Sequence, residues 1–253
     1  MFAQERRLEI LKILVNKTKV KVKELSLDFE VSEVIIRKDL KLLEDEGKLE
    51  RTHGGAILKK KIPVNISLDH RKIVNLIGKK KITNKLYKII EEGEIIFLDA
   101  SSTNLLLAEK LAESPKKITV VTNMLDIMKC LDKVDKIELI GIGGTYHSIL
   151  GTFLGGLALD SIYKINTQKL FLGGAAIDVQ KGNISIFDSN EVNLKKAMIQ
   201  MTSKVYFVCE KDKFYSYGTY NFGTITDLDA IVIDEQIEKQ FEEKLRENGV
   251  EII

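Results

Sequence analysis

The stretch Ser32–Leu58 most constrains what this 253-residue chain can fold into. Ser32 is suited to cap a helix by accepting from the free N–H groups of its first turn, and Gly47 can end that helix in the left-handed conformation. A short extended run, a turn with two adjacent glycines and a second extended run then predict a small β-hairpin. A helix that leads directly into a hairpin is typical of a winged helix-turn-helix.

The predicted helix has an apolar face and a basic face. Ile36, Leu40 and Leu43 recur at helical spacing, which predicts that they pack inward. The opposite face is basic, and in an isolated helix such a face is more often a solvated surface. The hairpin that follows favours DNA instead. The residues expected at DNA are Ser32, Arg37, Lys38, Lys41, Arg51, His53 and Gly54.

Two earlier helical patterns complete a three-helix unit, one at residues 4–16 and one at residues 22–29. Arg6 and Arg7 in the first pattern are candidates for phosphate contacts or for plain solubility. Residues 1–61 hold 15 Lys+Arg against 11 Asp+Glu, a net charge of +4, whereas the remainder carries −2. The basic excess therefore lies with the predicted DNA-binding unit, as phosphate binding requires.

The sequence also lacks the marks of several other protein classes. No stretch approaches the about 18 uncharged apolar residues of a membrane helix, and no signal peptide is recognised, so we expect a cytoplasmic protein without a membrane partner. Cys130 and Cys209 fit neither a disulfide framework nor a metal-site spacing. Neither GxGxxG nor GxxxxGKS occurs. We therefore expect no metal and no cofactor.

From Gly93 onward, apolar runs alternate with helical patterns, which predicts an α/β domain with a mostly parallel sheet. The expected strands are residues 94–98, 118–122, 137–140, 169–172, 204–209 and 230–233. The expected helices are residues 104–111, 125–131, 191–202 and 236–248. Residues 69–92 read as mostly helix, irregular around Gly78. We thus expect a winged helix-turn-helix domain at 1–60, a linker and leading helix at 61–92, and the α/β domain at 93–253.

Polar loops follow several expected strands at their carboxyl ends, where open α/β sheets bind ligands. Three consecutive hydroxyl residues, Ser101, Ser102 and Thr103, lead into a helix N-terminus, an arrangement that suits a phosphate. Simple capping by Ser102 or Thr103 is the alternative. The other loops are residues 122–123, 143–144 and 173–174. Their recurrence favours one shared crevice over independent turns.

Residues 31–56, VSEVIIRKDLKLLEDEGKLERTHGGA, resemble the N-terminal signature of the DeoR family of bacterial transcriptional regulators. Ile35 and Lys38 stand where that family usually has Thr and Arg. FLDASST, VVTN, LIGIGG, FLGGAAID, NEVNLKKAMI and VYFVCEKDKF resemble its C-terminal sensor, which is ribose-5-phosphate-isomerase-like and binds phosphorylated sugars. The resemblance implies a repressor of a sugar uptake or catabolism operon. Its partners would be double-stranded operator DNA and a phosphorylated sugar, and paired half-sites imply a homodimer or homotetramer.

The ligand contacts that this resemblance implies are Asp99, Ser101, Ser102, Thr103, Asn123, Glu191, Lys195 and Lys213, and the loop pattern adds Gly144. Glu191 and Lys195 are alternatively a solvated i,i+4 pair. One rival function is a sugar-phosphate isomerase-like enzyme with a DNA-binding module, in which Glu191 or Asp99 moves a proton next to a carbonyl. Another is an architectural DNA binder with a degenerate sensor. Nothing in the sequence defines a preorganised base, so no catalytic residue is expected.

Overall fold

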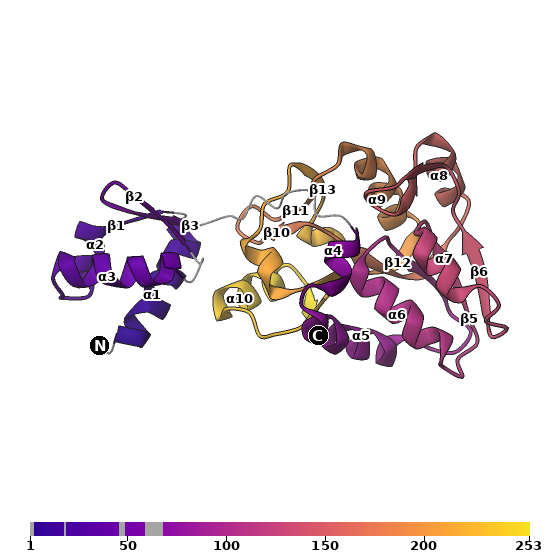
Figure 1. Cartoon of the computed structure of the whole chain (residues 1–253), viewed down its shortest axis with the longest axis horizontal. Helices are drawn as coiled ribbons and strands as arrows, with labels where there is room; N and C mark the ends of the chain where they lie inside the picture. The colour runs from indigo at the N-terminus through magenta and orange to yellow at the C-terminus, as the bar shows by residue number, and fades with distance from the viewer. Residues whose placement is uncertain (1–2, 18, 46–48, 59–67) are drawn as a thin grey trace. The chain divides into compact units, whose positions relative to one another are not determined.

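The computed structural model describes residues 3–17, 19–45, 49–58 and 68–253. The chain forms two compact units, Met1–Lys61 and Ile62–Ile253 (Figure 1). The expected helix end at Gly47 and the chain around Pro63 lie outside the described residues. Within the described part, no helix combines the length and apolar character needed to cross a membrane.

The described part of the first unit contains three helices and a three-stranded antiparallel sheet of order β1-β3-β2. Its elements are α1 (Ala3–Lys17), β1 (Lys19–Lys21), α2 (Val22–Asp28), α3 (Glu33–Asp45), β2 (Leu49–Thr52) and β3 (Gly55–Leu58). Ile36, Leu40 and Leu43 of α3 are buried, as their spacing predicted, in a core with Ile10 and Leu14 of α1. The sequence analysis did not predict β1, which alternates Lys-Val-Lys but is only three residues long.

Two adjacent glycines shape the hairpin tip for different reasons. Gly54 has a φ of 92°, in the left-handed region that glycine adopts without strain. A Cβ on Gly55 would lie 1.9 Å from the carbonyl oxygen of Val20, because β1 pairs directly with β3. The conformational freedom predicted for both glycines is therefore used at Gly54, whereas Gly55 permits the close approach of another strand.

A buried ion pair links α1 to α3. The Nε of Arg6 donates to Oδ2 of Asp39 at 2.6 Å, and the two residues are 7% and 3% exposed. A buried charge is tolerated when it is paired and hydrogen-bonded. Both roles suggested for Arg6 by the sequence, a phosphate contact and simple solubility, are wrong, because its guanidinium is engaged inside the unit.

A seven-stranded sheet organises the second unit, with the order β15-β14-β12-β9-β4-β5-β6 and every neighbouring pair parallel. Its strands are β4 (Ile95–Leu98), β5 (Ile118–Thr122), β6 (Ile137–Gly141), β9 (Thr167–Gly173), β12 (Thr202–Cys209), β14 (Ala230–Ile233) and β15 (Glu251–Ile252). The predicted α/β class is confirmed. After β4 the chain adds β5 and β6 toward one edge of the sheet, and after β9 it adds β12, β14 and β15 toward the other edge. The strand order therefore reverses between the neighbours β4 and β9.

Helices and small antiparallel strands surround this sheet. The helices are α4 (Leu68–Ile73), α5 (Leu76–Ile89), α6 (Ser102–Ala112), α7 (Leu125–Leu131), α8 (Gly156–Ile162), α9 (Val192–Gln200) and α10 (Lys239–Glu247), with 3-10 turns η1 (Ser189–Glu191), η2 (Lys211–Tyr215) and η3 (Ile225–Asp227). The small strands are β7 (Thr145–His147), β8 (Thr152–Leu154), β10 (Ala176–Asp178), β11 (Asn183–Ile186) and β13 (Tyr220–Thr224). Helices α5, α6 and α7 pack side by side (Figure 1), and α9 packs on β9, β12 and β13.

The helices of the expected linker segment belong to the second unit. Ile82, Leu86 and Ile90 are buried in the same core as the inner residues of the sheet. The helical run is interrupted at Asn75, whose φ of 48° lies in the left-handed region, while Gly78 sits inside α5. The boundary expected at residue 93 is therefore corrected, because the apolar face of α5 covers the sheet instead of bridging two domains.

Candidate functional site

The basic side chains expected at DNA lie on the exposed face of α3. Arg37, Lys38 and Lys41 are exposed opposite the buried face. Ser32 caps the helix, with its Oγ accepting from the N–H of Ile35 at 3.4 Å. On the surface Arg37 pairs with Glu33 at 2.9 Å. Such an exposed pair contributes little, so DNA can displace it.

The hairpin presents the remaining expected DNA residues. Arg51, His53 and Gly54 are exposed. The backbone N–H of Arg51 donates to Oε1 of Glu44 at 2.9 Å, which ties β2 to the end of α3. An exposed basic helix held against an exposed hairpin fits the geometry in which a recognition helix enters the major groove while other elements contact the backbone.

The second unit has a cavity at the point where its strand order reverses. Loops leave opposite sides of the sheet at such a switch point and open a crevice at the carboxyl ends of the strands. A cavity of about 180 Å³ lies there, lined by parts of α4, the loop between β4 and α6, the ends of β9 and β12, and α9. The sheet order therefore decides which of the polar loops can share a ligand.

The N-terminus of α6 forms one wall of the cavity. The Oγ of Ser101 caps the helix by accepting from the N–H of Asn104 at 3.1 Å. Ser102 and Thr103 are 6% and 5% exposed and line the cavity. Capping is thus performed by Ser101, and Ser102 and Thr103 remain at the wall. The first N–H groups and the positive end of the helix dipole at this wall favour an anion.

A buried ion pair joins Asp99 to Lys195. The Nζ of Lys195 lies 2.5 Å from Oδ2 of Asp99 and 3.1 Å from the carbonyl oxygen of Gly173. Asp99 also accepts from the backbone N–H groups of Ala100 and Gly173, each at 2.8 Å. The two charged side chains are 2% and 3% exposed. Asp99 thereby holds the loop after β4 against the end of β9.

Lys213 and Glu210 border the cavity at the end of β12. The Nζ of Lys213 lies 3.7 Å from Oδ1 of Asp212, and its side chain is 26% exposed. Glu210 instead lies 3.4 Å from the Nζ of Lys79, inside the protein. Burial raises the pKa of Glu210, and the nearby Lys79 and Lys213 oppose that rise. Lys79 is therefore engaged internally, whereas Lys213 keeps donors for a ligand.

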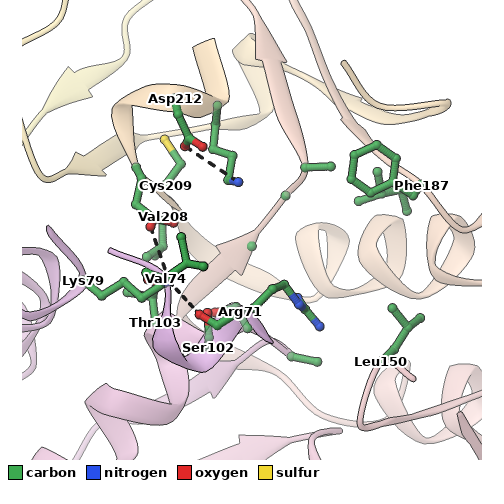
Figure 2. Close-up of a pocket in the computed structure, with 18 of the residues that line it drawn as sticks. Arg71, Val74, Lys79, Ser102, Thr103, Leu150, Phe187, Val208, Cys209 and Asp212 are labelled. Atoms are coloured by element: carbon green, nitrogen blue, oxygen red, sulfur yellow. Dashed lines mark hydrogen bonds and ion pairs between the residues drawn. The ribbon is translucent and has the colours of Figure 1, made fainter. Parts of the chain in front are cut away.

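Arg71 and Glu191 face the same cavity from α4 and η1. Burial lowers the pKa of the Arg71 guanidinium, and the charges of Glu191 and Asp99 oppose that change. Burial raises the pKa of Glu191, with Lys195 opposing from 4.0 Å. The alternative of a solvated Glu191–Lys195 pair is wrong, because Lys195 is buried against Asp99. Figure 2 shows Arg71 extending from its helix toward the middle of the cavity.

Two family models match this chain. The DeoR-like helix-turn-helix domain matches residues 6–61, and the DeoR C terminal sensor domain matches residues 74–235. The chain belongs to the DeoR family. Both matches agree with the division into two units, and the resemblance seen in the sequence is confirmed.

Curated relatives along nearly the whole length of this DeoR-family chain are named as transcriptional regulators. The transcriptional repressor AccR of Agrobacterium fabrum is 31% identical over 250 residues, which cover 98% of this chain and 96% of AccR. The putative aga operon transcriptional repressor of Escherichia coli O157:H7 is 28% identical, covering 98% and 93%. The L-fucose operon activator of Haemophilus influenzae is 29% identical, covering 87% of each chain. This DeoR-family protein is a DNA-binding transcriptional regulator.

The DeoR-family sensor also has distant neighbours among solved structures. Ribose 5-phosphate isomerase A from Neisseria gonorrhoeae has a TM-score of 0.40 and 17% identity, covering 55% of this chain and 53% of that one. The eIF2B beta of Chaetomium thermophilum has a TM-score of 0.47 and 15% identity, covering 68% and 53%. Neither likeness carries an argument about activity.

The ligand residues expected for the DeoR sensor separate into two groups. Those that line the cavity are Ser101, Ser102, Thr103, Glu191, Lys195 and Lys213. The prediction that Asp99 contacts the ligand is corrected. Asp99 is absent from the cavity lining, and its oxygens accept from Ala100, Gly173 and Lys195 inside the protein. Asn123 and Gly144 are also absent from the lining, because β5 and β6 lie on the side of β4 away from β9. There the Nδ2 of Asn123 donates to the carbonyl oxygen of Phe153 at 3.3 Å, which holds the β8 strand.

Three basic cavity residues of the DeoR sensor were missed from the sequence. His70 and Arg71 come from α4, and Lys79 comes from α5. They belong to a stretch dense in lysine and arginine, which is usually a solvated helix face. The helical period alone could have shown that Lys79 falls on the same face as the buried Ile82 and Leu86. No local signal marks the position of Arg71, since α4 ends after six residues.

Proposed function

We propose that this regulator represses a sugar uptake or catabolism operon and that a phosphorylated sugar in the cavity of the second unit controls it. The observation that carries the proposal is the N-terminus of α6, with Ser102 and Thr103 at the cavity wall and Lys213 of η2 lining the same cavity. Helix N–H groups, hydroxyls and an ammonium together suit a phosphate. Glu191, which also lines the cavity, is assigned the role of accepting from sugar hydroxyls.

The proposed regulator works as a two-state switch. An effector shifts the two states only by binding them differently, and a coupling of about 100-fold corresponds to about 2.7 kcal/mol. Because bacterial regulators usually bind paired half-sites, we also propose that it acts as a homodimer or homotetramer. We propose that the sensor binds its sugar phosphate without converting it, consistent with relatives named as regulators.

Removing the phosphate contacts should abolish the effector response. We expect Thr103→Val and Lys213→Ala to leave operator affinity intact while losing the about 100-fold effect of a sugar phosphate on operator binding. Fluorescence anisotropy with labelled operator, measured across a panel of pentose and hexose phosphates and the matching free sugars, provides the readout. The free sugars should have no effect on the wild-type protein.

Lys211→Ala is the matched control, because Lys211 lies two residues before Lys213 in the sequence yet pairs with Glu238 at 3.3 Å and does not line the cavity. It should respond as the wild type does. A normal response in both Thr103→Val and Lys213→Ala would remove the proposed phosphate site. A free sugar as active as its phosphate, or isomerisation of a sugar phosphate in the same samples, would contradict the proposed sensor.

The exposed basic face of α3 yields a separate prediction about DNA. Arg37→Ala should weaken operator binding by about 1–3 kcal/mol and relax preference at one base pair, as loss of a bidentate base contact does. Lys41→Ala should weaken all sequences alike, because a phosphate contact carries no base information. Competition on the operator, its single-base variants and random DNA separates the two effects. Equal losses of Arg37→Ala on operator and random DNA would argue against the base contact.

A further inference from the structure

Arg71 occupies an unusual electrostatic position in the second unit. It lies on α4, which is held by Leu68 in the core and by the Lys72 Nζ at 2.6 Å from Oδ2 of Asp126. Arg71 itself projects into the cavity (Figure 2). The contacts of its neighbours thus fix the backbone of the helix and leave the guanidinium directed at the space where a ligand would lie.

The Nε of Arg71 is buried, although the residue as a whole is partly exposed. Among the residues that the structure describes, its buried Nε–H has no hydrogen-bond partner. Burial accordingly lowers the pKa of Arg71. Buried polar groups are normally hydrogen-bonded, and a guanidinium is shaped to bind a phosphate or carboxylate through two parallel N–H groups. An oxyanion in the cavity would supply the acceptor that this Nε–H lacks among the described residues.

Two acidic residues, Glu191 and Asp99, attract the charge of Arg71, but neither is well suited to accept a hydrogen bond from its Nε. Asp99 already accepts from Lys195, Ala100 and Gly173. Glu191 lies 4.0 Å from Lys195, and its own burial raises its pKa, which weakens its hold on a second cation. Within the described part of the chain, Arg71 therefore experiences attraction from Glu191 and Asp99, but no acceptor is hydrogen-bonded to its Nε.

The helix that carries Arg71 is tied to the other side of the same cavity. The Nζ of Lys79 donates to the carbonyl oxygens of Arg71, at 2.8 Å, and of Val74. The same ammonium lies 3.4 Å from Glu210 at the end of β12. Between α4 and α5 the chain turns through the left-handed Asn75. One lysine thus links the end of α4, the turn at Asn75 and a strand end that borders the ligand space.

We infer that Arg71 binds the anionic group of the effector, and that α4 is thereby the element through which occupancy of the cavity is passed on. The inference rests on the proposed function and adds a specific ligand residue to it. In the described part of the second unit α4 is the first element, so it follows the residues that connect to the DNA-binding unit. An anion bound by Arg71 acts directly on this element and, through Lys79, on the end of β12.

Inorganic phosphate is the probe that tests this site without knowledge of the sugar. We expect it to bind the full-length wild type, measured by calorimetry, and to bind Arg71→Met about 10–100-fold more weakly, the range for losing a hydrogen bond to a charged group. Arg71→Lys should recover part of the affinity, because it keeps the charge but loses the planar fork. Phosphate should slow amide hydrogen exchange in residues 68–79 of the wild type and leave Arg71→Met unchanged.

Lys80→Met is the control on the neighbouring helix α5, since Lys80 is exposed and does not line the cavity. It should bind phosphate as the wild type does. Unchanged phosphate affinity in Arg71→Met, an equal loss in Lys80→Met, or no phosphate binding to the wild type would overturn the inference. Operator release by a sugar phosphate reports on the proposed function separately: its absence, with Arg71-dependent phosphate binding retained, would refute the sensor role and keep the anion site.

Discussion

Lys195→Met should destabilise the second unit by about 3–5 kcal/mol, the cost of removing one partner from a buried ion pair. Methionine keeps much of the side-chain volume, so the loss comes from the charge. Asp99, 2% exposed at its side chain, would retain its two backbone donors but lose the ammonium 2.5 Å away. The free energy of unfolding, followed in urea by the intrinsic tyrosine signal of this tryptophan-free chain, is the measurement.

The adjacent Lys196→Met provides the matched control, because Lys196 is exposed on the same helix. It should change stability by no more than about 0.5 kcal/mol. The double variant Asp99→Asn with Lys195→Met should regain part of the loss, since an uncharged amide needs no counter-charge. A loss below about 1 kcal/mol in Lys195→Met, within the range of an exposed pair, would contradict the buried-pair assignment.

Asp39→Ala should have an effect of similar size in the first unit, about 3–5 kcal/mol, because it leaves the guanidinium of Arg6 buried without its carboxylate. The pair joins residues 33 positions apart and fastens α1 to α3. The two units of the chain need not unfold together, so a single melting curve is ambiguous. Amide hydrogen exchange of α1 and α3 in the full chain measures the local effect directly.

Lys38→Ala is the control for this variant, because Lys38 is exposed on α3 beside Asp39. It should leave exchange in α1 and α3 unchanged within about 0.5 kcal/mol. Exchange in the sheet of the second unit should be the same in both variants. If α1 and α3 remained as protected in Asp39→Ala as in the wild type, the ion pair would have no structural role.

Local sequence determined much of this protein. Helix α3 and the hairpin follow from a capping serine, an apolar stripe and two glycines, all within one short stretch. The strands β5 and β14 and the helix α7 have the bounds that their apolar patterns predicted. The hydroxyl loop before α6 was recognisable because a helix N-terminus attracts anions whatever lies around it. These features depend on residues a few positions apart, and periodicity and capping report such distances well.

Tertiary structure alone decided which of the predicted polar groups meet. The sequence places the loops after β4, β5 and β6 in succession, but the pairing of β4 with β9 brings Gly173 to the cavity and leaves Asn123 and Gly144 outside it. Pairing across about 70 residues leaves no periodic trace, because it depends on how whole strands bury their faces. For the same reason the sequence predicted Asp99 as a ligand residue, and only the structure shows its ion pair with Lys195 from a distant helix. The role proposed for Arg71 likewise follows only from its position in the cavity lining.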